Sequence, residues 1–209
     1  MDDIIEEVKI LVKNGTKEII LTAQDTTEYG KDLYGERMLV DLLKKLVKIK
    51  ELKWIRLLYS YPEHITDELI KVIKENDKIC NYLDIPVQHS SNRIRKEMRR
   101  EGTTEELLEV IEKLRNEIPD IALRTSMIVG FPGETKEDFN NLKDFIKVVK
   151  FDRLGVFQYS QEEGTKAAKM EKQIDKKTKE KRYNKIMEIQ QDISYNKNRK
   201  YIGKERGRK

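Results

Sequence analysis

The sequence predicts an α/β fold, an incomplete TIM-like parallel barrel followed by a long C-terminal helix. Apolar, strand-like runs alternate with amphipathic helical patterns through most of the chain. The starts of successive expected strands lie 35, 29, 40 and 31 residues apart, which is the length of a βα unit. Runs such as Met127–Val129 are continuously apolar, as in strands buried on both faces of a parallel sheet. The chain has 209 residues, fewer than the roughly 250 of a closed eight-unit barrel.

Each element has its own local signal. The apolar runs predict strands at Glu18–Ala23, Lys53–Tyr59, Tyr82–Val87, Ala122–Val129 and Arg153–Tyr159. Helical periodicity predicts helices near Ile4–Lys13, Arg37–Lys48, Asp67–Asn76, Thr104–Glu117 and Lys136–Val149. Thr66, Thr103 or Thr104, and Thr135 stand where helix N-caps belong. From Lys176 to Lys200 no strand signal remains, and isoleucines at 186, 189 and 193 predict one long amphipathic helix leaving the barrel.

Charge is distributed unevenly along the chain. The formal net charge is +5, but residues 166–209 carry 16 Lys and Arg against 6 Asp and Glu. The remaining residues carry 27 against 32. A basic tail of this kind favours an acidic or nucleic-acid-rich partner. The alternative is an ordinary solvated helix in a lysine-rich protein.

The composition also limits where the protein can reside in the cell and which metal sites it can form. No run approaches the roughly 18 apolar residues of a membrane span, and no signal-peptide pattern opens the chain, so we expect a cytoplasmic protein. The single cysteine, Cys80, excludes an intramolecular disulfide and is expected just before a strand, as a small core residue. His64 is expected on an exposed turn. These residues and His89 have no metal-ligand spacing.

In a parallel α/β barrel the chemistry lies at the carboxyl ends of the strands, and the residues there are polar. They include Gln24 and Asp25, Tyr59, Gln88 and His89, Arg124 within the fourth strand, the turn Gly130–Thr135, and Glu162 after the fifth strand. Few of them are nucleophiles, so the set suits binding of a polar cofactor better than hydrolysis. His89 could instead cap the helix that starts near Ser91, and Glu162 could be an ordinary loop charge. Arg124 needs a partner or a ligand, because it is a charge within an apolar strand.

These strand-end residues carry a resemblance to a known family. The segments are Gln24-Asp25-Thr26-Thr27 with Tyr29-Gly30, Trp54 to Tyr59, Leu83 to His89, Gly130 to Thr135, and Tyr159 to Thr165. In order and spacing, from about Ile4 to Gly203, they resemble the radical S-adenosylmethionine (SAM) methylthiotransferases. Two segments resemble those of the branch that modifies an aspartate of small-subunit ribosomal protein S-twelve. They are Gln24-Asp25-Thr26-Thr27 and Gln88-His89-Ser90-Ser91. The tRNA-modifying MiaB type usually has Gln-Asn-Val-Asn and Gln-Ser-Gly-Ser there.

The resemblance implies a radical SAM barrel that transfers a methylthio group to the β-carbon of the substrate aspartate. The implied cofactors are SAM and 4Fe-4S clusters. The residues expected to bind the cofactor are Gln24, Tyr59, Gln88, Arg124, Gly130 and Phe131. Those expected to bind the substrate are Asp25, His89 and Glu162. No residue of this chain is assigned as catalytic or as a metal ligand.

The sequence departs from the family at its cluster. The family's three-cysteine motif would lie upstream of Met1, and Cys80 alone cannot hold a 4Fe-4S cluster. We therefore expect an enzyme fragment that is inactive alone, with residues 1–165 as a partial radical SAM barrel. Residues 166–200 form a basic helix or linker, and 201–209 begin a TRAM-type domain. The expected partners are ribosomal protein S-twelve or the small ribosomal subunit, RNA through the basic segment, and a separate N-terminal part if the gene is split.

Two alternatives remain from the sequence. One is a tRNA methylthiotransferase of the MiaB type. The other is a non-catalytic remnant that binds ribosomal protein or RNA.

One prediction follows from the single cysteine. Anaerobic reconstitution of this chain with iron and sulfide should leave it colourless, because a 4Fe-4S cluster needs several thiolate ligands and the chain has one thiol. Visible absorption spectroscopy after desalting measures the outcome. A stoichiometric cluster absorbance would contradict the prediction.

Overall fold

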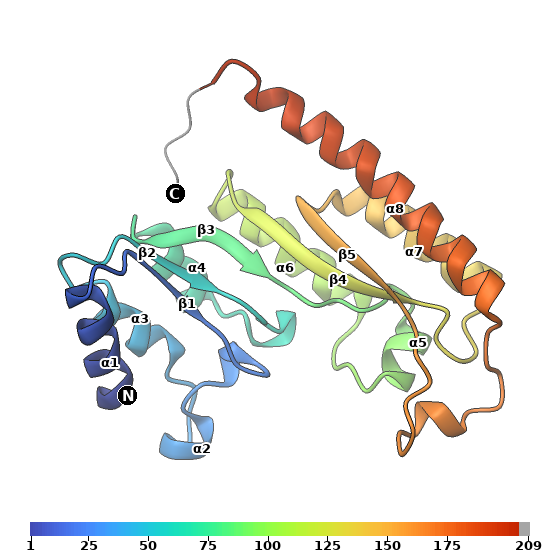
Figure 1. Ribbon diagram of the computed structural model, residues 1–209, viewed down its shortest axis with the longest axis horizontal. Coiled ribbons are helices and arrows are strands. Elements are labelled where there is room, and N and C mark those ends of the chain that lie inside the picture. Colours follow the sequence, from blue (N-terminus) through green and yellow to red (C-terminus); the bar gives the residue numbers. More distant parts are fainter. Residues whose placement is uncertain (205–209) are drawn as a thin grey trace. The chain divides into compact units, whose positions relative to one another are not determined.

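A computed structural model describes residues 1–204 of the chain. Strands and helices alternate along the chain (Figure 1). The strands are β1 (Glu18–Leu21), β2 (Trp54–Leu57), β3 (Ile79–Asp84), β4 (Ala122–Val129) and β5 (Arg153–Gln158). The strands β1, β2 and β3 neighbour one another in chain order, and β4 neighbours β5. The predicted class, an α/β parallel sheet with fewer strands than a closed TIM barrel and a long C-terminal helix, is confirmed.

The helices cover most of the remaining chain. They are α1 (Asp2–Lys13), α2 (Lys31–Tyr34), α3 (Leu39–Leu46), α4 (Asp67–Lys74), α5 (Asn92–Glu97), α6 (Thr104–Glu117), α7 (Lys136–Val149) and α8 (Lys176–Asn198). Short 3-10 turns are η1 (Thr26–Glu28), η2 (Pro62–His64), η3 (Ala167–Lys169) and η4 (Arg199–Tyr201). Among residues 1–204 no helix is both long enough and apolar enough to cross a membrane.

The chain forms two compact units. The first contains Met1–Ile85 and Val110–Ala122. In it β1 pairs with β2 and β2 with β3, all parallel. The helices α3 and α4 bury their leucine and isoleucine faces, and Leu43 and Leu46 are completely buried. This burial follows from the apolar spacing of these helices, since residues three and four apart share one face.

Among the described residues, the second unit contains Pro86–Glu109 and residues 123–204. In it β4 and β5 run parallel, with Arg124 opposite Arg153 and Val129 opposite Gln158. Odd-numbered residues of β4 are buried and even-numbered ones are half-buried. The sequence had predicted burial on both faces, but one face of β4 keeps partial access to solvent.

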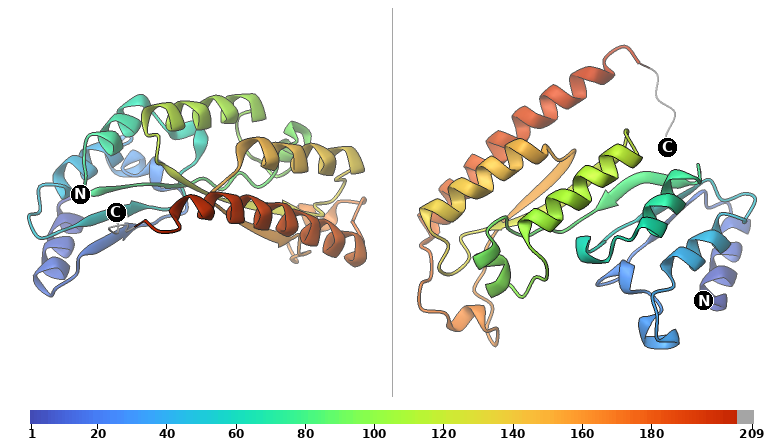
Figure 2. Two further views of the ribbon diagram at one scale, coloured as in Figure 1. Left: turned by 90° about the horizontal axis from the view of Figure 1, so that it is seen from above. Right: turned by 180° about the vertical axis from the view of Figure 1, so that it is seen from behind.

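The helix α8 packs against β5 and α7 within this second unit, as both views of Figure 2 show. Its residues Ile186 and Ile189 are buried, and Gln190 donates to the Phe151 carbonyl at 3.0 Å. The helix was predicted to leave the barrel. It instead lies along the sheet, because its isoleucine stripe covers the outer strand.

Most predicted boundaries agree with the structure to within three residues. The largest difference is β3, which begins at Ile79 and ends at Asp84. Cys80 therefore lies within this strand, where it is buried, and not before it. The strand ends early because Pro86 has no N–H to donate to a ladder. Thr66 caps α4, accepting the Leu69 N–H at 3.2 Å, and Thr103 accepts the Glu106 N–H at 3.2 Å, so both predicted caps are confirmed.

Candidate functional site

The turn after β4 requires glycine at its first position. Gly130 has a φ of +74°, and a Cβ at this residue would collide with the Cγ atom of Lys179. Only glycine satisfies both conditions without strain. At the other end of the turn, Thr135 and Asp138 form a capping box that starts α7. The predicted Thr135 cap is confirmed.

A buried carboxylate holds this turn from inside. The side chain of Glu134 is fully buried, and its carboxylate accepts the backbone N–H of Gly130. The guanidinium of Arg182, on α8, lies 3.1 Å from Glu134 Oε2 and also donates to the Glu134 carbonyl at 3.1 Å. A fully buried carboxylate requires such partners. The pair therefore fixes both the turn and the start of α8.

His89 lies against the same carboxylate. Its Nδ1 accepts the Ser91 N–H at 2.9 Å, so in the neutral ring the proton is on Nε2. Nε2 lies 3.7 Å from Glu134 Oε1, too far for a hydrogen bond. Neither atom has a hydrogen-bond partner among the residues described. Ser91 is the N-cap of α5, and no side chain caps the first turn of this helix. His89 thus accepts the N–H of the N-cap residue but does not itself cap the helix.

Lys179 joins α8 to the end of β5. Its ammonium donates to the Tyr159 carbonyl at 2.8 Å and lies 5.0 Å from the centre of the Tyr159 ring. That ring in turn meets Phe131 edge to face at 5.3 Å. Two cations of α8, Lys179 and Arg182, thus hold the turns that follow β5 and β4, respectively.

A second polar cluster joins the starts of α5 and α7. The carboxylate of Asp138 accepts hydrogen bonds from Ser91 Oγ (2.6 Å), from Thr135 and from Arg93. Burial alone would raise the pKa of Asp138, but these donors hold it far below its ordinary value. Asp138 therefore remains ionised in the folded protein at neutral pH.

These turns surround a cavity of about 380 Å³ within the second unit. Its wall combines apolar and aromatic surface with a polar amide and several charges. The lining residues are Gln88, Glu97, Met98, Arg99, Arg100, Ile128, Phe131, Tyr159, Lys166 and Ala167. The volume falls in the range of small-molecule sites, and the mixture of surfaces is typical of them.

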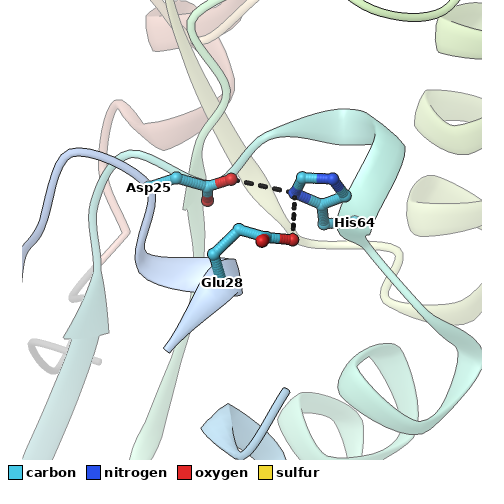
Figure 3. Close-up of side chains that lie close together, drawn as sticks. All are labelled: Asp25, Glu28 and His64. Atoms are coloured by element: carbon cyan, nitrogen blue, oxygen red, sulfur yellow. Dashed lines mark hydrogen bonds and ion pairs between the residues drawn. The ribbon is translucent and has the colours of Figure 1, made fainter. Parts of the chain in front are cut away.

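In the first unit, His64 lies between two carboxylates (Figure 3). Its Nδ1 is 2.8 Å from Asp25 Oδ2 and 3.3 Å from Glu28 Oε1. One ligand atom from each of the three residues lies within 4.8 Å of the others. Glu28 is also paired with Lys31 and Arg37, and chiefly the Lys31 hydrogen bond lowers its pKa. Since these cations offset the carboxylates, we interpret the cluster as an ion-pair network that joins η1 to η2.

This network corrects the prediction for His64. Only 15% of its side chain is exposed, whereas the sequence predicted an exposed turn residue. The Tyr61 ring stacks on the imidazole with ring centres 6.4 Å apart. The nearby Asp25, predicted to bind substrate, also caps η1 by accepting the Thr27 N–H at 2.9 Å.

The residues predicted to bind a cofactor fall into both units. Gln88 and Phe131 line the cavity, and Gly130 adjoins Phe131. Arg124 shares the half-buried face of β4 with Ile128 but stands four residues earlier, about 13 Å along the strand, and does not line the cavity. Gln24 and Tyr59 belong to the first unit and are exposed. Tyr59 has a φ of 54°.

The residues predicted to bind substrate differ in access. Asp25 belongs to the network of the first unit. His89 is completely buried, so it cannot touch a substrate in this conformation. Glu162 is exposed in the loop after β5.

Sequence reasoning missed several residues that build the site. They are Lys179 and Arg182 on α8, Arg93 on α5, and Arg99 just after α5. The sequence predicts that the basic C-terminal segment is a solvated or RNA-binding face. It does not predict that Arg182, in the second turn of α8, pairs with Glu134. A buried glutamate within a Gly-Phe-Pro-Gly-Glu-Thr turn was the available signal, because such a carboxylate needs a cation from elsewhere.

Comparison with known proteins identifies the family. A family model described as the radical SAM superfamily matches residues 1–146. Among solved structures, coproporphyrinogen III oxidase (HemN) from Escherichia coli, a radical SAM enzyme, superposes with a TM-score of 0.70. The match covers 92% of this chain and 46% of that one, at 16% identity. Streptococcus suis SuiB, solved bound to S-adenosylmethionine, gives a TM-score of 0.54 over 79% of this chain and 34% of that one, at 16% identity. At such identities the likeness concerns the fold alone.

Curated relatives are much more similar in sequence. The protein named ribosomal protein uS12 methylthiotransferase RimO from Carboxydothermus hydrogenoformans is 58% identical over 204 residues, which cover 98% of this chain and 47% of the relative. The protein of the same name from Clostridium perfringens is 56% identical over 205 residues, 98% of this chain and 46% of the relative. The chain thus spans about half the length of these relatives.

The buried pair yields a stability prediction. Glu134→Gln should lower the free energy of unfolding by about 2–3 kcal/mol, because it removes the charge that compensates Arg182 in a buried setting. Urea denaturation measures the change. Glu137→Gln, on the exposed first turn of α7 just after Glu134, is the matched control and should change stability by less than about 0.5 kcal/mol. Equal stability of Glu134→Gln and the parent would contradict the pairing.

The Asp138 cluster yields a prediction about acid. Because the folded pKa of Asp138 is depressed, its stabilisation is complete above the unfolded value of about 3.9 and is lost as pH falls through the folded value. Asp138→Asn should therefore destabilise the protein at neutral pH, and the gap to the parent should narrow below about pH 4. Melting temperatures from pH 7 to pH 2 measure this, with the exposed Asp144→Asn as control. A gap independent of pH would refute the assignment.

Proposed function

The chain belongs to the radical SAM superfamily, and from that premise we propose that it is part of a methylthiotransferase acting on ribosomal protein uS12. The observation that carries the proposal is 58% and 56% identity, across 98% of the chain, to proteins of that name. The acceptor would be the β-carbon of an aspartate, and the donor chemistry that of the superfamily. A ribosomal acceptor implies a cytoplasmic place of action.

The lining of the cavity in the second unit supports SAM as its ligand by the chemical groups that it offers. This cofactor has an adenine, a ribose diol, a sulfonium and an amino acid end. Ile128, Phe131 and Tyr159 supply an apolar and aromatic wall for a planar base. Gln88 supplies an amide, held at the cavity by its own N–H to Ser126 (2.9 Å) and by the Ile128 N–H to its carbonyl (2.7 Å). Superfamily members bind this cofactor together with a 4Fe-4S cluster, which supplies the electron for its cleavage.

The cluster itself does not fit the residues of this chain. Cys80 is the one cysteine, it is buried within β3, and burial raises the pKa of its thiol. A thiol of this kind is a poor ligand, and one ligand cannot hold a 4Fe-4S cluster. We therefore derive no step of the reaction through the cluster. This chain's residues bind the cofactor, orient it and exclude water from it.

We assign a role to each predicted site residue from its exposure to solvent and its position relative to the cavity. We assign Gln88, Gly130 and Phe131 to the cofactor wall, with Arg124 further along the same face of β4. We keep Gln24 and Tyr59 as cofactor residues, and Asp25 and Glu162 as residues that meet the protein substrate, because all four are at least partly accessible. His89 acts by positioning, since its ring is buried between Ser91 and Glu134.

The basic segment gives the chain a second surface for the ribosome. On α8 the exposed lysines 177, 181 and 185 are each four residues apart, so they form a cationic strip suited to the RNA phosphates of the small subunit. We keep the domain assignments 1–165 for the barrel part, 166–200 for the helix and 201–209 for the start of a TRAM-type domain, of which residues 205–209 lie outside the described ones. A separate N-terminal part remains a proposed partner if the gene is split.

A genetic experiment tests the function. Deleting the gene from its host should remove the mass gain of one methylthio group from uS12, measured by mass spectrometry of the intact protein and its aspartate-containing peptide. Restoring the parent gene should return the modification. Restoring Gly130→Ala should not, because its Cβ would collide with Lys179 and its φ is left-handed. Lys169→Ala is the control, an exposed residue of η3 outside the cavity lining.

The outcomes separate the alternatives. An unchanged uS12 mass, together with loss of a methylthio group from a tRNA nucleoside, would favour the MiaB type. No change in either would favour a non-catalytic remnant.

A further inference from the structure

One glycine of the second unit is not required by the backbone. Residues 1–204 contain nine glycines, and eight of them have a positive φ, the conformation that favours glycine. Gly155 is the exception. It lies within β5, whose extended backbone is open to residues with a side chain. A glycine inside a strand weakens the strand, because it has no side chain to pack and loses much conformational freedom on folding. Gly155 therefore costs stability without meeting a conformational need.

Packing within the chain does not require this glycine either. Apart from its chain neighbours, a Cβ at Gly155 would approach only the Phe157 ring among the described residues, at 3.6 Å. That is an ordinary van der Waals distance. At Gly130, by contrast, a Cβ would collide with Lys179. The space over Gly155 is therefore left open by the residues that the structure describes.

Gly155 lies beside the cavity of the second unit. In the sheet it stands opposite Ser126, and Phe157 stands opposite Ile128. Ile128 lines the cavity, and so does Gln88, whose side-chain amide donates to Ser126 Oγ at 3.4 Å. Gly155 and Phe157 do not line the cavity themselves. They form a surface that continues from the cavity wall onto β5.

This surface on β5 is apolar as well as open. Phe157 is 57% exposed although it lies in a strand. Leu154 and Val156, which point to the other face of β5, are buried. An exposed aromatic ring next to a cavity offers an apolar contact to a second molecule that approaches the ligand of the cavity.

We propose that the acceptor segment of the protein substrate crosses β5 at Gly155, with Phe157 as its apolar contact, resting on the proposed function for the identity of the substrate. Glycine suits this role because, without a Cβ, it lets another backbone approach the strand closely. The acceptor β-carbon has to reach the ligand of the cavity, so the segment that carries it has to pass next to the cavity wall. A ligand held inside the cavity does not need Gly155, which is outside the lining.

The test measures how fast uS12 is modified in the host that lacks the gene. The parent gene or a variant is induced while uS12 is expressed at a limiting level, and the mass of intact uS12 is followed over time. Gly155→Ala should lower the initial rate roughly tenfold, because a methyl group forced into a close contact weakens substrate binding. Phe157→Ala should lower it roughly fivefold, because it removes the apolar contact. Raising the level of uS12 should bring both rates back toward that of the parent, since more substrate overcomes weaker substrate binding.

Melting temperatures of the purified chain separate substrate binding from folding. Gly155→Ala should not lower the melting temperature, because alanine fits the extended backbone and restricts the unfolded chain. Val148→Ile is the matched control. It adds one carbon to a residue of α7 that is 70% exposed and outside the cavity lining, so neither the rate nor the melting temperature should change.

Each outcome decides for or against the acceptor path. Equal rates for Gly155→Ala and the parent would overturn it. A lower rate that excess uS12 does not restore would also overturn it, because the defect would then concern the cofactor or the fold, and so would a lower melting temperature of Gly155→Ala. A Phe157→Ala rate equal to that of the parent would overturn the contact assigned to Phe157. If the parent gene returns no methylthio group to uS12, the proposed function fails, and the acceptor path fails with it.

Discussion

The second unit depends on one buried carboxylate. Glu134 has no access to water, so its charge has to be compensated by the protein. The Gly130 N–H does this from the same turn, and Arg182 does it from α8. Because those partners are far apart in sequence, compensating a single charge forces the last helix onto the end of β4. The packing of Ile186 and Ile189 against the sheet then follows the same geometry.

The bonds of Glu134 also position residues of the cavity wall, because its partners are next to wall residues along the backbone. Glu134 binds Gly130, which directly precedes the cavity residue Phe131. It also binds Arg182, which lies one helical turn after Lys179. The carboxylate of Glu134 therefore positions both Phe131 and Lys179, and these two residues contact the ring of Tyr159. Arg95 does the same from the other side by holding the chain next to Gln88. Because the backbone is held by contacts on both sides of the cavity, Gln88 and Arg99 can keep their left-handed φ angles. In a loop without such contacts these residues would adopt a less strained conformation.

The sequence predicted the local features well and the long-range pairings poorly. Strands such as Ala122–Val129 and the Thr66 and Thr135 caps depend on neighbours within a few residues, so their signals are complete in the sequence. His64 and Arg182 find their carboxylates across 39 and 48 residues, and no local pattern records such a distance. Arg99 was missed for another reason. It lines the cavity with a φ of +57°, and arginine gives no signal that it will occupy a position suited to glycine.

The residues of the second unit are suited to binding a ligand, and the chain lacks the thiolates of an iron–sulfur cluster. Its cavity, its turn glycine and its cations are complete within the second unit, whereas the thiolates that a 4Fe-4S cluster needs are not among its residues. Fold similarity at 16% identity would be compatible with many radical SAM substrates, because a fold does not specify its ligands. Under the proposed function, the substrate is recognised by groups outside the regular elements, and Glu162 in the loop after β5 is one that we assign to this role. Under the proposed function, the contribution that this chain's own residues make is therefore to bind and orient the ligand, through the turn after β4 and the wall that Gln88 and Phe131 form.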